Sequence, residues 1–236
     1  MIAVLIAGAV AMALSLFGTR ALISFFDSIG KGQPILGSDD HGPVHHMKKQ
    51  GTATMGGIAI MVSAFIGWGA AHLRGGIALS DQAMIMWAIC GVLSVIGFLD
   101  DYLKVHRAQN RGIFWKKKGY ITFGLVVVMM TWLLLGTGVS ETLSFTRFDF
   151  PGWQLSPVLW VVWTSLMVWA TTNAVNVTDG LDGLAAGSAL FGFLAFTVIA
   201  YWAFRNPDIY NLVNPLDLAV FSAAMAGACG GFLWWN

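Results

Sequence analysis

Residues 120–139 read "YITFGLVVVMMTWLLLGTGV", twenty residues without a single Asp, Glu, Lys or Arg. About 20 mostly apolar residues suffice for a helix to cross the hydrocarbon core of a bilayer. Six further stretches have the same character: Ile2–Gly18, Ile58–Ala71, Gln82–Leu99, Leu155–Thr172, Leu184–Phe204 and Leu218–Trp235. The second reaches spanning length only if Met55–Leu73 is counted. Seven such stretches predict an all-α integral membrane protein, a polytopic bundle of transmembrane helices.

The overall composition supports this class. The chain is 57% hydrophobic and 11% charged, with a mean hydropathy of +0.70, whereas an ordinary soluble domain is about 25% charged. The first apolar stretch lacks a basic segment before it, and the first Lys or Arg is Arg20. We therefore interpret it as a retained helix and not as a cleaved signal peptide. Residues 1–236 are expected to form one transmembrane domain.

Basic residues alternate between the predicted loops. Segments 19–54 and 100–119 hold four and six Lys or Arg residues, whereas Arg74, Arg147 and Arg205 each stand alone in an intervening loop. Positive charge in short loops marks the cytoplasmic side. The pattern predicts an external N-terminus and a cytoplasmic location for the loops near 26–54, 100–119 and 173–183.

The first of three polar clusters is residues 39–57, "DDHGPVHHMKKQGTATMGG". It has two interpretations. A solvated loop could lead into a helix capped by Thr54. Alternatively, backbone N–H groups at the helix start, together with Lys49, would favour a phosphate group.

The second cluster contains Asp100 and Asp101, in "FLDDYLKVHRAQNRG" at 98–112. We expect both to end the third helix, where carboxylates oppose the helix macrodipole. Two carboxylates in this place suit Mg²⁺, which is commonly held by one or two carboxylates plus substrate phosphates. The alternative is a pair of solvated carboxylates whose charges are balanced by Lys104 and Arg107.

The third cluster is "NAVNVTDGLDGL", residues 173–184. Residues three apart are neighbours on a helix face, so Asn173, Asn176, Asp179 and Asp182 would follow one another along one side. A capped helix–turn–helix would explain one Asn and one Asp, but not all four. Polar groups at membrane depth are costly and usually functional.

No Asp, Glu, Lys or Arg lies mid-span in any of the seven apolar stretches. Transporters and pumps place such residues near the midplane of the membrane. The pattern therefore favours chemistry at the cytoplasmic interface, between a lipid and a water-soluble substrate, over transport.

Four motifs, "KQGTATMGG" (49–57), "GFLDDYLK" (97–104), "NAVNVTDGLDGLAAG" (173–187) and "GFLWWN" (231–236), follow one another in the order found in one enzyme family. In them the chain resembles the phospho-N-acetylmuramoyl-pentapeptide transferases, of the polyprenyl-phosphate N-acetylhexosamine-1-phosphate transferase superfamily. The resemblance implies transfer of phospho-MurNAc-pentapeptide from UDP-MurNAc-pentapeptide to undecaprenyl phosphate. The products are lipid I and UMP, the cofactor is Mg²⁺, and the place is the bacterial plasma membrane.

The resemblance also implies roles for residues at matching positions. Asp100 would deprotonate or orient the lipid phosphate, and Asp101 would support the metal–phosphate centre. The residues implied to bind substrate are Lys49, Thr54, Lys104, Asn176, Asp179, Gly180, Leu181, Asp182 and Asn236. The candidate metal ligands are Asp100, Asp101 and Asp179.

The family continues past "FLWWN" with a loop that carries an Mg²⁺-binding Asp and with three more helices. From this we expect a C-terminally shortened chain, with seven helices of ten, that does not turn over alone. Two alternatives stay open: a GlcNAc-1-phosphate transferase of the same superfamily, and a non-catalytic membrane subunit that binds a nucleotide or a lipid phosphate. We expect no nucleic-acid partner, and a homodimer is compatible with the sequence.

Overall fold

The computed structural model describes residues 1–29, 56–107, 115–144, 150–178, 181–210 and 212–236. These residues form seven helices and one small hairpin, which confirms the predicted helical bundle. The helices are α1 (Ile2–Ile29), α2 (Gly57–Leu73), α3 (Asp81–Arg107), α4 (Trp115–Thr137), α5 (Pro157–Thr178), α6 (Leu184–Arg205) and α7 (Pro215–Leu233). The hairpin pairs β1 (Thr142–Leu143) with β2 (Trp153–Gln154) in antiparallel register.

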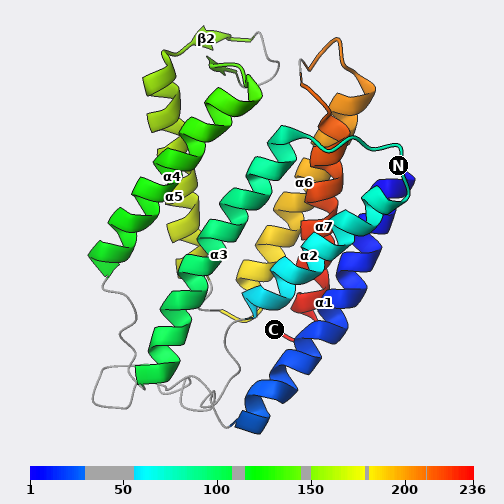
Figure 1. The fold of residues 1–236 in the computed structure, drawn as a ribbon, viewed down its shortest axis with the longest axis vertical. Helices are drawn as coiled ribbons and strands as arrows, with labels where there is room; N and C mark the ends of the chain where they lie inside the picture. Colours follow the sequence, from blue (N-terminus) through cyan, green and yellow to red (C-terminus); the bar gives the residue numbers. More distant parts are fainter. Residues whose placement is uncertain (30–55, 108–114, 145–149, 179–180, 211) are drawn as a thin grey trace.

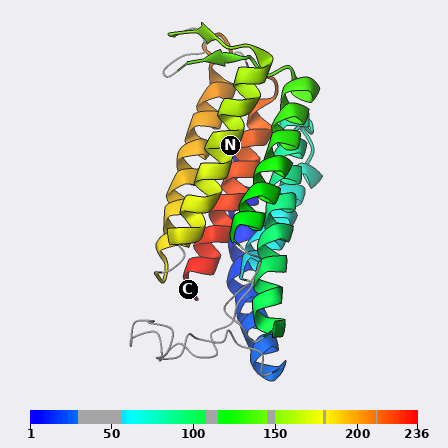
Figure 2. The same cartoon turned by 90° about the vertical axis from the view of Figure 1, so that its left-hand side faces the viewer.

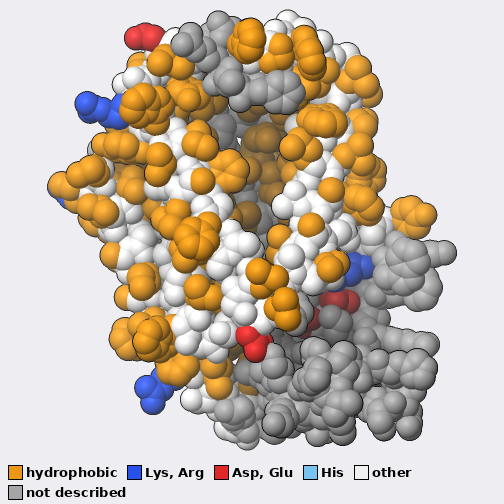
Figure 3. Space-filling view, turned by 180° about the vertical axis from the view of Figure 1, so that it is seen from behind, with side chains coloured by type: hydrophobic (Ala, Val, Ile, Leu, Met, Phe, Trp, Pro, Cys, Tyr) orange, Lys and Arg blue, Asp and Glu red, His pale blue; other side chains and the backbone are white. Residues whose placement is uncertain are grey.

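Six of the seven described helices are long and apolar enough to cross a membrane, and α2 is the shorter exception. Hydrophobic side chains cover most of the lateral face in Figure 3. Many of them are exposed on α6, such as Phe191 at 73% and Phe196 at 60%. Large apolar side chains on the outside of a bundle are expected where lipid is the solvent. The chain is a multi-pass membrane protein.

The helices alternate in direction (Figures 1 and 2). α1, α3, α5 and α7 end at one end of the bundle, where α2, α4 and α6 begin, and where the chain's C-terminus lies. We call this the motif end. The described residues of the connections at the opposite end are 74–80, 138–144, 150–156, 206–210 and 212–214. The described residues of the second and third polar clusters lie at the motif end, and the first cluster, apart from Gly56 and Gly57, lies outside the described residues.

α1, α2, α6 and α7 form the tightest part of the bundle because small residues let their backbones approach. A side chain added at Gly67 of α2 would lie 2.6 Å from the Ala7 carbonyl oxygen of α1. Gly227 and Gly231 of α7 are in equally close contact with the backbone of α1. Helix association in membranes depends on such packing, because lipid supplies no hydrophobic drive between helices.

α3, α4 and α5 form a second group, which contacts the first mainly through α3 (Figure 1). Trp87 of α3 packs edge-on against Phe65 and Trp68 of α2 and Phe221 of α7, with ring centroids 4.8–5.8 Å apart. This aromatic cluster lies near the opposite end of the bundle.

Two helices continue beyond the ends of the apolar stretches that predicted them. α1 continues past Gly18, so Arg20 is helical, and α3 continues past Leu99 to Arg107. Asp100 and Asp101 therefore lie inside α3, and the argument that they oppose the macrodipole at its end fails. A helix satisfies its own backbone hydrogen bonds, so it does not have to end where its apolar stretch ends.

Two further corrections concern α5 and α7. α5 ends at Thr178 and Asp182 lies in the turn before α6, so the helical face does not extend from Asn173 to Asp182. α7 begins at Pro215, three residues before the predicted start, and therefore includes Asp217. The sequence prediction concerned Asp, Glu, Lys and Arg in mid-span, and Asp217 does not contradict it, because it lies in the first turn of α7.

Candidate active site

Asp100 is the best-defined polar group at the motif end. It comes from α3, is 5% exposed, and accepts a hydrogen bond from Lys118 of α4, with Nζ 2.9 Å from Oδ2. Ionised partners make such bonds stronger than neutral ones. Lys118 holds a negative charge in place at the membrane boundary, and the sequence had given it no role.

Asp101 follows Asp100 on α3 and is half-buried. Successive residues on an α-helix point about 100° apart, because one turn takes about 3.6 residues. The two carboxylates therefore face different directions, and only Asp100 has a described ion pair with Lys118. Lys104 lies one turn further along α3, and its side chain is outside the described part of the chain.

α4 and α5 are tied together next to this pair. The Trp169 indole N–H donates to the carbonyl of Gly119, the residue after Lys118, at 3.1 Å. The Asn173 side chain in turn donates to the Trp169 carbonyl at 2.7 Å. The Trp169–Gly119 hydrogen bond thus connects the segment next to Lys118 with the helix that carries Asn173 and Asn176. Asn176 is exposed near the end of α5.

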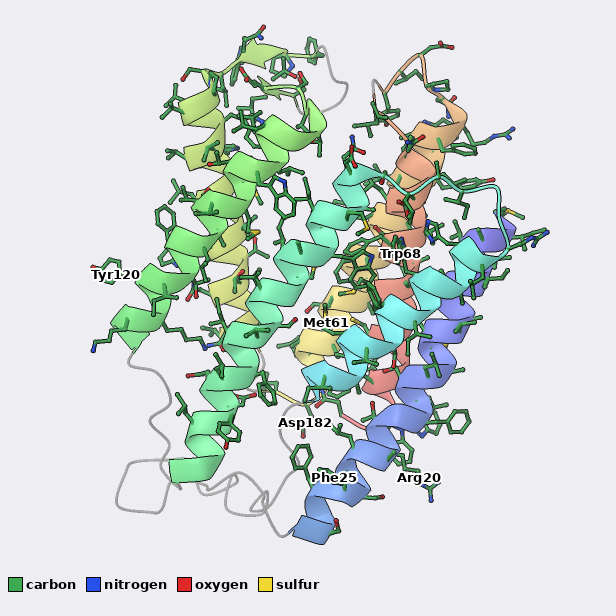
Figure 4. The ribbon with its side chains drawn as sticks, viewed as in Figure 1. Arg20, Phe25, Met61, Trp68, Tyr120 and Asp182 are labelled. Atoms are coloured by element: carbon green, nitrogen blue, oxygen red, sulfur yellow. The ribbon has the colours of Figure 1, made fainter. Side chains whose placement is uncertain are left out.

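A second group of motif residues surrounds the end of α7. A side chain at Gly183, which has φ 74°, would lie 3.3 Å from Leu233, so the turn carrying Leu181 and Asp182 abuts α7. Gly56, at the start of α2, is in close contact with the Phe232 ring. Leu181 and Asp182 are exposed. Figure 4 places Asp182 at the motif end.

Asn236 is held in this second group by the residue before it. The Trp235 indole N–H donates to the Leu16 carbonyl of α1 at 2.8 Å. The Arg20 guanidinium carbon lies 5.8 Å from the centre of a Trp235 ring, within the range of a cation–π contact. Neither Arg20 nor Trp235 had been predicted to take part.

The structure thus brings the predicted residues to one end of the bundle in two groups, one around Asp100 and one around Asn236. Lys49, Thr54, Asp179 and Gly180 lie outside the described residues. Within the described part, no three His, Cys, Asp or Glu side chains gather closely enough to hold a metal ion. Asp100 and Asp101 still fit Mg²⁺, because it needs only one or two carboxylates when substrate phosphates supply other ligands.

Comparison with known sequences decides the family. The family described as Glycosyl transferase family 4 matches residues 83–236. A phospho-N-acetylmuramoyl-pentapeptide-transferase of Streptomyces griseus is 37% identical over 99% of this chain and 69% of its own length. Proteins of the same name from Mycobacterium avium and Mycobacterium tuberculosis are 38% and 39% identical, each over 99% of this chain and 68% of their own length. The chain belongs to the phospho-N-acetylmuramoyl-pentapeptide transferase family. It spans about two thirds of these relatives, and the match includes α3 with Asp100, α4 with Lys118 and α7 with Asn236.

Proposed function

We propose that this protein transfers phospho-MurNAc-pentapeptide from UDP-MurNAc-pentapeptide to undecaprenyl phosphate. A phosphate oxygen of the lipid attacks the β-phosphorus of the nucleotide sugar. The bond from that phosphorus to the bridging oxygen breaks, and UMP leaves with the bridging oxygen. The products are lipid I and UMP, so the protein would serve peptidoglycan synthesis in the bacterial plasma membrane, with its active site on the cytoplasmic face.

The observation that carries the proposal is the part-buried Asp100–Lys118 pair at the same end of the bundle as Asp182 and Asn236. Phosphoryl transfer asks the protein mainly for positioning and for electrostatic stabilisation of the transferring group. Asp100 provides a fixed carboxylate that can accept a proton from the lipid phosphate or orient it. Lys118 keeps that carboxylate in place and adds a positive charge 2.9 Å away.

The remaining groups suit substrate binding. Asn176 and Asp182 have exposed hydrogen-bonding side chains at the same end as Asn236, where a sugar diphosphate or a uridine would bind. Lys49, Thr54, Lys104, Asp179, Gly180 and Leu181 have the implied binding roles by position in the motifs. Mg²⁺, held by Asp101 with Asp100 or Asp179 and the substrate phosphates, would neutralise charge on the transferring group.

The test is transfer from radiolabelled nucleotide sugar into lipid by the purified chain in nanodiscs with undecaprenyl phosphate and Mg²⁺. UDP-MurNAc-pentapeptide and UDP-GlcNAc are supplied separately, and release of UMP is measured in parallel. The proposal predicts label in lipid only from the muramoyl donor, and none with Asp100→Asn. Such transfer would at the same time overturn the expectation from the family motifs that residues 1–236 do not turn over alone. Transfer from UDP-GlcNAc alone would assign the chain to the alternative transferase class.

A non-catalytic binding subunit makes a different prediction. Such a protein would bind UDP-MurNAc-pentapeptide in a calorimetric titration and release no UMP with either donor. Asp100→Asn would then leave its effect in a host cell unchanged. That combination of results would contradict the proposal.

A further inference from the structure

A carboxylate that accepts three hydrogen bonds lies far from the motif end. Asp217, in the first turn of α7, is 1% exposed. Its Oδ1 accepts the Trp68 indole N–H of α2 at 2.7 Å. Its Oδ2 accepts the Ser80 backbone N–H at 2.7 Å and the Ser80 hydroxyl at 3.0 Å. Three donors compensate the removal of this charge from water.

Ser80 is the residue from which α3 starts. Its hydroxyl accepts the Ala83 N–H at 3.1 Å, as an N-cap does, while donating to Asp217. His72 of α2 completes the cluster: its Nδ1 bonds the Trp68 carbonyl at 2.9 Å, and its Nε2 lies 3.3 Å from Oδ1 of Asp217 without the alignment of a hydrogen bond. One side chain of α7 thus fixes the end of α2 and the start of α3 together.

These three helices, like α5 with Asn176, lead to predicted site residues. α2 begins beside residue 54, α3 carries Asp100, and α7 leads into Asn236. At the motif end, α2 is held on α7 through Gly56 and Phe232. α3 is held at that end by Lys118, which belongs to its own group of helices. The contacts through which Ser80 and Trp87 of α3 meet α2 and α7 lie in the other half of the bundle.

Two sets of described contacts hold α3 against α2 and α7 there. One is the Asp217–Ser80 pair of hydrogen bonds, and the other is the packing of Trp87 against Trp68 and Phe221. At about 1.5 Å per helical residue, Ser80 and Trp87 lie roughly 10 Å apart along α3, and Asp100 lies about 20 Å beyond Trp87. If α3 pivots at Trp87, a movement of Ser80 is about doubled at Asp100.

We propose that Asp217 is a positioning residue that orients α3 on α7. It thereby sets where Asp100 lies relative to Asn236 and the turn of Asp182. The consequence for catalysis rests on the proposed transferase function, but the geometric role does not. Asp217→Asn tests it, because the amide offers one acceptor oxygen where the carboxylate offers two and turns an N–H₂ group toward the existing donors. Lengthening the hydrogen bonds at Ser80 by about 1 Å would move Asp100 by about 2 Å.

The geometric test measures distances between spin labels by pulsed electron resonance, in a background with Cys90→Ala and Cys229→Ala. Labels at L99C and W234C report α3 against α7, and both native positions are exposed. Labels at F25C and W234C report the distance between α1 and α7, two helices that Asp217 does not connect.

We expect Asp217→Asn to shift or broaden only the α3–α7 distance, by about 2 Å. Asp208→Asn, which removes an exposed carboxylate at the same end, should change neither, and Asp217→Glu should restore most of the first. An unchanged first distance in Asp217→Asn overturns the proposal, as does an equal change in both.

The kinetic test separates positioning from a loss of folded protein. With transfer measured as above, we expect Asp217→Asn to lower kcat about 10- to 100-fold, since misplacement by about 1 Å can cost on the order of 100-fold. The KM for UDP-MurNAc-pentapeptide should stay within about threefold, because the close packing of Gly67 and Gly227 on α1 and of Gly56 on Phe232 still holds α2 and α7 together without Asp217. Recovery of kcat by Asp217→Glu supports the proposal, and a loss that only tracks the folded fraction contradicts it. If the wild-type chain transfers neither sugar, the transferase proposal fails, and the spin-label distances still decide the role of Asp217.

Discussion

The ion pair between Asp100 and Lys118 should be measurable as a coupling energy. We predict that Asp100→Asn and Lys118→Met are strongly non-additive in the free energy of unfolding. Both replacements keep the approximate size of the side chain and remove its charge. In the single Lys118→Met variant a carboxylate that is 7% exposed loses the ammonium group 2.9 Å away. In the double variant no charge is left to be compensated.

The structure sets the size of this coupling. Two unit charges 2.9 Å apart attract by about 6 kcal/mol at an effective dielectric constant of 20 and by about 1.4 kcal/mol in water. The Lys118 side chain is 26% exposed, so screening places the pair between these limits. Desolvation of both groups offsets a large part of the attraction. We therefore expect a coupling of about 1.5–3 kcal/mol, at the upper part of the range for residues in contact.

The assay is reversible unfolding in mixed micelles, followed by tryptophan fluorescence, for the wild type, both single variants and the double variant. Lys117 provides the matched control, because it is the adjacent lysine and is exposed. The cycle of Lys117→Met with Asp100→Asn should give no measurable coupling. A coupling below about 0.5 kcal/mol for Lys118, within the usual error of additivity, would refute the inference that the pair fixes Asp100. Equal couplings for the two lysines would refute it as well.

Three further predictions follow from contacts at defined positions. Gly67→Ala should destabilise the protein by about 1–3 kcal/mol in the same unfolding assay, because the new Cβ would overpack against α1. Gly69→Ala, with nothing within 4 Å, should gain up to about 1 kcal/mol from helix propensity, and a loss equal to that of Gly67→Ala would contradict the packing argument. Gly183→Ala should cost about 1–2 kcal/mol, because φ 74° is strained for a residue with a side chain, whereas Gly187→Ala on α6 should not destabilise the protein. Trp235→Phe removes the hydrogen bond to Leu16. Because such a bond contributes about 0.5–1.5 kcal/mol, UMP binding in a calorimetric titration should weaken about threefold to tenfold. The control Trp234→Phe should bind UMP as the wild type does.

The sequence predicted the helices well because the signal is a simple physical one. A charge-free stretch such as residues 120–139 can only be stable inside a bilayer as a helix, so its existence and type are determined. The ends of such a helix are not determined, because the need to satisfy backbone hydrogen bonds in lipid does not say where a helix stops in water. α3 therefore extends eight residues past the predicted end at Leu99 and places Asp100 inside a helix.

The candidate site was predicted in part, for a related reason. Motif residues indicate which chemistry is present, but not which neighbour each one contacts. Lys118 stands in a row of three lysines, Lys116 to Lys118, and choosing among them requires the rotation of α4 about its axis relative to α3. Asp217 was missed although a signal existed: Pro215 in the first turn of a helix with an acidic residue two positions later is a typical helix start.

The two ends of α7 explain how a bundle with few polar contacts can hold a precise site. In lipid, helices associate through close packing and hydrogen bonds, with no water to drive them together. α1 and α2 obtain that packing from small residues such as Gly67 and Gly227, which fix their distance from one another and from α7. The glycines of α3, Gly91 and Gly97, make no comparable close contact with another helix, and ring packing such as that of Trp87 restrains tilt less than a backbone contact does. In the proposed role, the buried carboxylate of Asp217 limits that tilt, because its hydrogen bonds have a defined length and direction. For a site built from side chains on separate helices, the residue that most affects geometry then lies where no substrate reaches, and variants of Asp217 should lose turnover before they lose binding.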